Sequence, residues 1–229
     1  MSQKPNTRTL LLEASQELFS SRGYSAVSTR QIADKAGVNL GAIQYYFGSK
    51  SGLFIETVRH LISTNCEGLS SLGLGTPALS RIEAAGNICS FIFLFTKEMC
   101  NPQGHDLNRI MHREILTTTP DNMELIEALL SLVVDEFWAP IDRELCALVR
   151  ILLPEAEPDD IYHTAHSIAG QCVHLAVKRP YIARLRGRDF GKEPLLSASC
   201  ESIARFSLRA VGLSEREIDE ALFASNKQT

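Results

Sequence analysis

Apolar residues recur at intervals of three and four along most of the chain, the spacing that gathers them on one face of a helix. The first such stretch carries Leu11 and Phe19. It predicts a helix from Thr9 to Arg22 that ends at Gly23, a residue well suited to closing a helix. No stretch shows convincingly the alternation of polar and apolar residues that marks a half-buried strand. The pattern therefore predicts an all-α protein.

Past residue 70 the same spacing continues between prolines, which interrupt helices because they lack a backbone N–H. Residues 68–77 are rich in glycine, serine and other small residues, and they predict the end of one helix followed by a connector to a C-terminal domain. In that domain we expect helices at about Leu79–Met99, His105–Leu116, Met123–Leu153 with a break at Pro140, Asp159–Val177, Leu195–Val211 and Ser214–Ala224.

Two short helices are predicted after the first one. Ser28 and Gln31 have the spacing of a capping box, in which each side chain bonds the backbone N–H of the other residue and so starts a helix. This second helix stops at Gly37, because glycine adopts the left-handed conformation without steric cost. Asn39 then suits the N-cap of a third helix from Leu40 to about Tyr46.

The turn between these two helices has the small and apolar residues that a helix-turn-helix needs. Ala33, Gly37 and Ile43 lie at offsets of zero, four and ten: the first allows close approach, the second turns the chain and the third anchors the reading helix from beneath. A longer fourth helix follows over about residues 49–68. The alternative is a helical hairpin with no role in DNA binding, and the exposed residues argue against it.

With Ile43 directed inward, the third helix presents residue types that read DNA. Asn39 and Gln44 can make paired hydrogen bonds to adenine edges in the major groove, and Leu40 and Ala42 can contact thymine methyl groups. Tyr45 lies on the same outer side.

Three further residues flank this helix. Thr29 and Arg30 begin the second helix, where a hydroxyl group and the helix N-terminus can meet a phosphate, and Arg30 can also reach a guanine. Lys50 stands in the first turn of the fourth helix, where its charge opposes the helix dipole. A DNA phosphate would relieve that opposition; the alternative is a solvated lysine.

Charge is distributed unevenly along the chain, whose formal net charge is −4. The first sixty residues carry seven basic and four acidic side chains, a net charge of +3, so the remaining residues have a net charge of −7. A basic N-terminal segment on an acidic body suggests an anionic partner for that segment.

The sequence lacks the motifs of disulfide-rich, zinc-binding and common enzyme families. The six cysteines are widely scattered with no C-x-x-C pair, so we expect no disulfide framework and no structural zinc. His163 and His166 share a helix face with Asp159 or Asp160, and we favour a solvated or pocket-lining face there over a metal site. The chain has no nucleophile elbow, dinucleotide glycine motif or Walker lysine, which argues against an enzyme.

Hydropathy and the N-terminus predict where the protein acts. The longest apolar stretch falls well short of the roughly 18 residues of a membrane-spanning helix. Leu10–Leu12 is interrupted by Glu13, so no export signal is recognised. We therefore expect a cytoplasmic protein that does not bind a membrane.

The segments TRQIADKAGV (29–38) and GAIQYYFGSK (41–50), with Leu18-Phe19 and Gly23-Tyr24, resemble the DNA-binding domain of TetR-family transcriptional regulators. The resemblance implies an all-helical homodimer that binds operator DNA through its first three helices and senses a small molecule in a larger domain. Ser51 departs from the acidic residue often found there, and Tyr46 from the usual histidine. The DNA contacts this resemblance implies, together with those argued above, are Thr29, Arg30, Asn39, Leu40, Ala42, Gln44, Tyr45, Tyr46 and Lys50.

In the C-terminal part, residues 111–114 (MHRE), 167–172 (SIAGQC) and 179–185 resemble the C-terminal domain of a CecR-type TetR subfamily. We expect a DNA-binding domain at residues 1–55 and an effector-binding and dimerisation domain at 56–229, connected by the fourth helix. An effector pocket needs an apolar cavity with a few polar groups. Its candidate residues, each of a type that is more often plain core, are Phe91, Phe95, Met111, Trp138, His166 and Gln171.

The function predicted is a homodimeric repressor that binds a pseudo-palindromic operator and is released by a small-molecule effector, with no resident cofactor. A ligand-dependent activator, or a regulator whose C-terminal domain docks a protein, remains an alternative. One apolar stripe predicts either a dimer face or burial within one subunit: Leu196, Cys200, Ile203, Phe206 and Ala210.

Overall fold

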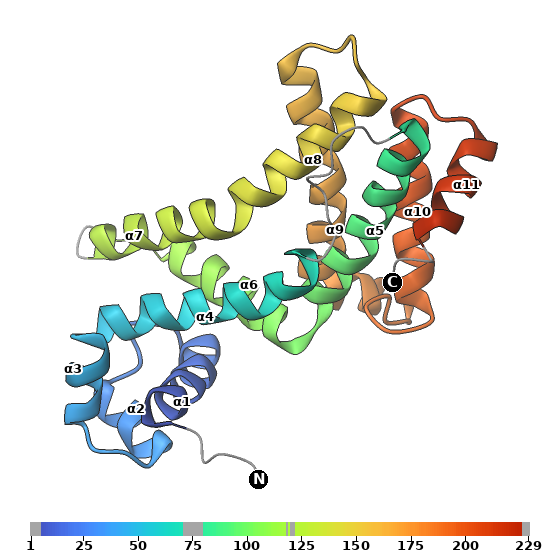
Figure 1. The fold of residues 1–229 in the computed structure, drawn as a ribbon. Coiled ribbons are helices and arrows are strands. Elements are labelled where there is room, and N and C mark those ends of the chain that lie inside the picture. Colours follow the sequence, from blue (N-terminus) through green and yellow to red (C-terminus); the bar gives the residue numbers. More distant parts are fainter. Residues whose placement is uncertain (1–5, 71–79, 118, 120–121, 226–229) are drawn as a thin grey trace. The chain divides into compact units, whose positions relative to one another are not determined.

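The fold is known from a computed structural model, which describes residues 6–70, 80–117, 119 and 122–225 (Figure 1). Within this part of the chain all regular structure is helical and there is no strand, so the all-α prediction is confirmed. Most helix ends lie within three residues of the predicted ones. The helices are α1 (Thr7–Arg22), α2 (Thr29–Ala36), α3 (Gly41–Phe47), α4 (Lys50–Ser70), α5 (Arg81–Cys100), α6 (Pro102–Leu116), α7 (Met123–Val133), α8 (Ala139–Leu152), α9 (Pro158–Arg186), α10 (Leu195–Ala210) and α11 (Glu215–Ser225).

The chain forms two compact units, each assembled from separate stretches of sequence. Unit 1 comprises Met1–Thr64 and Asp106–Phe137, and unit 2 comprises Asn65–His105 and Trp138–Thr229. These units are discontinuous in the sequence, so they do not test the functional boundary predicted near residue 55, which stays a prediction. Of the connector predicted at residues 68–77, the first three residues belong to α4 and the others lie outside the described residues.

Unit 1 has an aromatic core at the base of the helix-turn-helix. Phe19 of α1 and Phe54 of α4 are fully buried, and their ring centroids lie 5.0 Å apart in an edge-on arrangement. Ile32 of α2 and Leu53 of α4 are also fully buried in this unit. The predicted inward face of the first helix is confirmed, since Leu11 is completely buried.

Unit 2 is organised around α5, which contacts α8, α9, α10 and α11 (Figure 1). A helix covered on several sides cannot keep an exposed polar face, and α5 accordingly buries every residue from Ala84 to Ile92. Phe91 and Phe95 stack with their centroids 5.0 Å apart, and Trp138 meets Phe95 edge-on at 6.1 Å. This cluster forms the centre of the unit 2 core.

The predicted end of the ninth helix at Val177 is wrong, because α9 passes through Pro180 and continues to Arg186. Pro180 is exposed, and because it lacks an N–H, the carbonyl group four residues earlier receives no helical bond from it. The helix ends instead at Gly187, whose φ of 65° is left-handed.

The break predicted at Pro140 is found slightly earlier, as a π-helical turn at Val134–Trp138 between α7 and α8. Pro140 itself lies in the first turn of α8, where a missing N–H costs nothing because the first four N–H groups of a helix have no partner within it. A proline at this position therefore marks a helix start rather than a gap.

A partly exposed ion pair fixes the end of α9 to the loop that follows it. The Arg179 guanidinium donates two hydrogen bonds of 2.7 Å to the Asp189 carboxylate and a third, of 3.2 Å, to the carbonyl of Cys100. The hydrogen bonds from Arg179 hold the pKa of Asp189 at about 2, below its usual 3.8.

We predict that Asp189→Asn lowers the stability of the protein at neutral pH by roughly 1 kcal/mol, the scale of a partly exposed ion pair. Because the folded-state pKa of Asp189 is depressed, the stabilisation is complete above pH 3.8 and is lost as the pH falls through about 2. Thermal unfolding midpoints of the two proteins should therefore converge at acidic pH. Glu155→Gln, in an exposed turn of the same unit, is the control. A difference independent of pH would contradict the prediction.

Candidate nucleic-acid interface

The helix-turn-helix predicted from the sequence is present, with its caps. The Gln31 N–H donates to Ser28 Oγ at 3.3 Å, and the Ser28 N–H donates to Gln31 Oε1 at 2.8 Å, which completes the capping box at the start of α2. Gly37 closes α2 with a φ of 67°, and the Val38 N–H bonds the Ala33 carbonyl at 3.0 Å. These local bonds fix the angle at which α3 leaves the turn.

Helix α3 begins one residue later than predicted, at Gly41, and ends at Phe47. Leu40 is the N-cap residue and makes no side-chain cap bond, while Asn39 Oδ1 accepts a 2.8 Å hydrogen bond from the Gly41 N–H. The predicted capping by Asn39 therefore occurs in an Asx turn just outside the helix. Ile43 is buried, as predicted for the anchor of the reading helix.

The outer side of α3 carries the side chains predicted to read bases. Asn39 and Gln44 are exposed, Leu40 is 49% exposed and Tyr45 is 82% exposed. Ala42 is half-buried. Large apolar and aromatic groups on a short surface helix have no partner in the core to stabilise them, so their exposure suits a surface that meets another molecule.

Tyr46 also reaches the surface and lies edge-on to Tyr45, with ring centroids 4.9 Å apart. At the start of α2, Arg30 is exposed and Thr29 is half-buried. These positions flank α3 in unit 1 and offer hydroxyl and guanidinium donors of the kind that bind phosphate.

Lys50 has a partner within the chain that the sequence did not predict. Its Nζ lies 4.1 Å from the centroid of the Tyr24 ring, and the side chain is half-buried. Burial lowers the pKa of the Lys50 ammonium, and the charge of Glu114 opposes part of that shift. Lys50 is therefore held at the beginning of α4 by a cation–π contact rather than extended freely into solvent.

Several basic residues of the N-terminal segment are neutralised by carboxylates of unit 1. Arg8 Nη2 lies 2.6 Å from Glu56 Oε2, and Arg59 bonds both Glu56 and Glu136. Lys35 pairs with Glu17 at 2.7 Å in the same unit. Glu17 and Glu56 are already counted in the net charge of +3, whereas Glu136 lies beyond the first sixty residues and offsets part of that charge. Specific placement of side chains therefore matters more than total charge.

The predicted effector residues do not gather around one cavity of the described structure. Phe91, Phe95 and Trp138 belong to the aromatic cluster of unit 2. His166 is exposed on α9, and Met111 is half-buried in unit 1. Their role as effector contacts stays a prediction.

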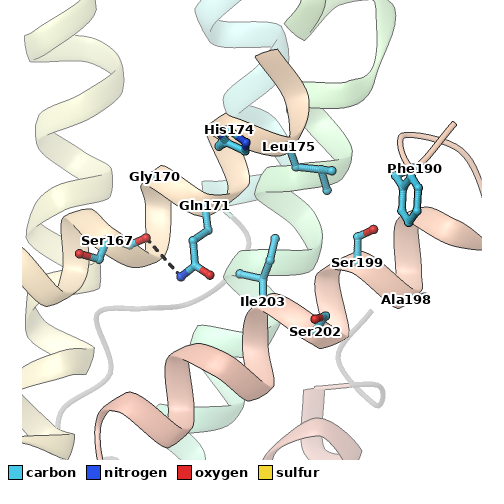
Figure 2. Close-up of a pocket in the computed structure, with 10 residues that line it drawn as sticks. All are labelled: Ser167, Gly170, Gln171, His174, Leu175, Phe190, Ala198, Ser199, Ser202 and Ile203. Atoms are coloured by element: carbon cyan, nitrogen blue, oxygen red, sulfur yellow. Dashed lines mark hydrogen bonds between the residues drawn. The ribbon is translucent and has the colours of Figure 1, made fainter. Parts of the chain in front are cut away.

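A groove of about 640 Å³ lies between α9 and α10 in unit 2 (Figure 2). Gln171, the one predicted effector residue that lines it, donates to the Ser167 carbonyl at 3.4 Å and to Ser207 Oγ at 3.2 Å. Figure 2 shows Gln171 facing Ile203 across the groove. The groove is open to solvent rather than enclosed, and its lining includes small residues such as Gly170 and Ala198.

The apolar stripe on α10 divides into two parts. Leu196 and Cys200 are buried within the chain, where α10 packs on α5, so for these two residues the alternative of burial within one subunit holds. Ile203 is half-buried, whereas Phe206 is 63% exposed and Ala210 is also exposed. Only the second part of the stripe offers a surface to a partner.

No group of three or more His, Cys, Asp and Glu side chains is placed to hold a metal ion in the part of the chain that the structure describes. Cys89, Cys172 and Cys200 are buried free thiols, and burial raises the pKa of each one above its usual value. Among the same residues no helix is both long and apolar enough to cross a membrane.

Comparison with known proteins now places this chain in a family. Residues 11–57 match the model of bacterial regulatory proteins of the tetR family, and residues 99–211 match the C-terminal domain of the HTH-type transcriptional dual regulator CecR. The chain belongs to the TetR family of transcriptional regulators. The predicted family is thereby confirmed, and it is a family of regulators rather than enzymes.

Curated relatives match over part of their length. The chain is 31% identical over 113 residues to a probable HTH-type transcriptional regulator, YttP, of Bacillus subtilis, which covers 49% of this chain and 52% of the relative. It is 30% identical over 127 residues to the regulator BetI of Yersinia pestis, covering 49% of this chain and 64% of BetI. The matches thus span about half to two thirds of these relatives.

Solved structures share the fold over nearly the whole chain. Mycobacterium smegmatis AmtR matches with a TM-score of 0.62 at 17% identity, covering 99% of this chain and 96% of AmtR. Bacillus subtilis FadR, solved in complex with stearoyl-CoA, matches with a TM-score of 0.60 at 18% identity, covering 86% of this chain and 96% of FadR. An N-terminal helix-turn-helix followed by a helical C-terminal domain is therefore confirmed as the architecture.

Proposed function

We propose that this regulator binds double-stranded operator DNA through α2 and α3 and represses transcription until a small-molecule effector releases it. The observation that carries the proposal is α3 itself: its anchor Ile43 is buried, while Asn39, Gln44 and Tyr45 are exposed on its outer side. A helix of this width enters the major groove, where amide side chains can distinguish adenine from the other bases.

The protein acts as a homodimer in this proposal. Two-fold symmetry places two reading helices about 34–36 Å apart, one turn of DNA, so the operator is a pseudo-palindrome. The exposed apolar residues of α9 and α10, such as Tyr181, Leu185 and Phe206, support an interface that involves these two helices. They are large side chains that gain from leaving water.

The names of related proteins support repression and effector release. The transcriptional repressor KstR2 of Rhodococcus jostii is 40% identical to this chain over 56 residues, which is 28% of the length of KstR2. FadR was solved with stearoyl-CoA, and CecR is described as a dual regulator. A small molecule that prefers one dimer conformation by about 1–3 kcal/mol would change DNA affinity about 5- to 150-fold. The name of CecR keeps activation as the second candidate.

The test of DNA binding is selection of genomic fragments with the full chain, followed by anisotropy titration of the recovered duplexes. Enriched sequences should share an inverted repeat, and they should bind roughly a thousandfold more tightly than shuffled duplexes of equal length. Absence of enrichment at low salt would overturn the proposal. The effector is sought by thermal shift against a metabolite panel that includes acyl-CoA esters, and a hit must also release DNA. If the C-terminal domain binds a protein partner instead of a metabolite, no compound of the panel should raise the unfolding temperature.

We expect Lys50→Ala to weaken binding to every duplex by a similar factor. Lys50 stands at the start of α4, and a contact with phosphate adds affinity but carries no base information. The slope of log Kd against log salt concentration should become shallower by about one, because one phosphate fewer is neutralised. Anisotropy titrations over a salt series measure this slope. A change in base preference with an unaltered slope would show that Lys50 has another role.

A further inference from the structure

The C-terminal turn of α6 packs against the loop that joins α1 to α2, although ninety residues separate them in the sequence. The Tyr24 N–H donates a 2.9 Å hydrogen bond to Glu114 Oε1. A Cβ atom added to Gly23 would lie 2.6 Å from Arg113 Cδ and 3.2 Å from Glu114 Oε1. Glycine is needed at this position both for the close approach and for its φ of +82°.

The Glu114 side chain is unusual in its burial, since the residue is only 3% exposed. A buried carboxylate loses its hydration, so it is stable only where hydrogen bonds and opposite charges replace the lost water. The Tyr24 N–H is one such donor. The positive charge of Lys50 is near enough to interact with it, as the effect of Glu114 on the Lys50 pKa indicates.

Tyr24 connects this carboxylate to the start of α4. Its ring packs against both Phe19 and Phe54, with centroid distances of 6.1 and 5.1 Å, and Lys50 Nζ stands 4.1 Å from its centre. The backbone of Tyr24 is therefore held from one side by Glu114, while its ring supports Lys50 on another.

We propose that Glu114 is a positioning residue for DNA binding: by holding the Tyr24 backbone it sets where the Lys50 ammonium stands. The residue touches no DNA and acts through Tyr24. This inference rests on the proposed function, because it assigns a role in the binding of operator DNA to a residue of α6.

The proposal predicts an effect opposite in sign to that of simple electrostatics. Removing a negative charge from a DNA-binding protein strengthens its attraction to phosphates when nothing else changes. Loss of the hydrogen bond to Tyr24 should instead weaken binding, because Lys50 is no longer placed to meet a phosphate. Glu114→Ala removes both the charge and the acceptor, whereas Glu114→Gln removes the charge and keeps an amide oxygen that can accept the bond.

The experiment compares the full-length variants on one duplex recovered by selection with the wild-type chain, using anisotropy titrations over a salt series. Glu114→Ala should bind roughly tenfold more weakly, with a salt slope shallower by about one, as for Lys50→Ala. The double variant with Lys50→Ala should bind no more weakly than Lys50→Ala alone. Glu114→Gln should keep the wild-type affinity and slope, or bind slightly more tightly.

Glu127→Ala is the matched control, since it removes the same charge from an exposed position on α7 in the same unit. It should leave the slope unchanged. Partial unfolding alone would reduce the active fraction of Glu114→Ala without altering the slope, so the slope separates positioning from a general structural role. If Glu114→Ala does not fold, Tyr24→Leu takes its place, because it keeps the N–H and removes the ring beneath Lys50; it too should flatten the slope.

Several outcomes would overturn the inference. They are wild-type affinity and slope in Glu114→Ala, equal weakening in Glu114→Gln and Glu114→Ala, additive losses in the double variant, or an unaltered slope in Tyr24→Leu when that variant is needed. A wild-type chain that binds no duplex at all contradicts the proposed function instead. The two failures are thus distinguishable.

Discussion

Gly52→Ala is expected to destabilise the protein by roughly 2–4 kcal/mol, the range of severe overpacking. Gly52 lies in the first turn of α4, and a Cβ atom there would overlap the carbonyl oxygen of Phe47. That oxygen belongs to the main chain at the end of α3, so it cannot turn aside as a flexible side chain would. The substitution must shift the junction between the reading helix and α4.

Alanine in a helix interior is normally favoured over glycine by about 1 kcal/mol. The expected loss of stability at Gly52 is therefore opposite in sign to the usual effect of this substitution. Gly170→Ala is the matched control, because Gly170 is also helical and an added Cβ would meet nothing within 4 Å in the described structure. Urea unfolding of both variants should therefore give midpoint shifts of opposite direction. A neutral or stabilising result for Gly52→Ala would mean that the α3–α4 junction yields easily.

Gln44→Ala is expected to cost about 1–3 kcal/mol of discrimination at one base pair of each half-site, the value of a paired hydrogen bond to a base. Gln44 is exposed on α3, one residue from the buried anchor Ile43. Since the anchor fixes the helix, loss of the amide should affect only the base pair that it contacts. For duplexes altered at that base pair, the variant and the wild-type chain should bind with the same affinity.

A panel of duplexes with each base pair of a half-site changed in turn measures this effect. The variant should bind all four bases at the affected position with similar affinity, while preferences elsewhere persist. Lys50→Ala is the natural contrast, because it should keep the whole preference profile and lower every affinity. A profile from Gln44→Ala that is uniformly weaker would assign Gln44 to the phosphate backbone.

Local signals in the sequence sufficed for the helix-turn-helix. The capping box at Ser28, the left-handed Gly37 and the anchor Ile43 depend on neighbours within a few residues, and all three were predicted. The exposed face of α3 followed from them, since burying one position of a helix determines which others point outward.

The contacts that the sequence did not reveal are long-range or depend on competition between signals. Glu114 lies ninety residues from Tyr24, and nothing near either residue indicates that they meet. Proline usually ends a helix, so Pro180 favours an end near Val177, but its exposed position and the cap at Gly187 allow α9 to continue. Which side chains line a cavity depends on how the helices of unit 2 pack together, which periodicity alone does not determine.

Unit 1 consists of two separate stretches of sequence, which affects how DNA-binding domains can be exchanged between regulators. Because residues 106–137 belong to the same compact unit as the first 64 residues, a chimaera that grafts only the N-terminal segment onto a foreign sensor would leave the α1–α2 loop without its native support. A transplant that includes the end of α6 together with α7 should preserve it.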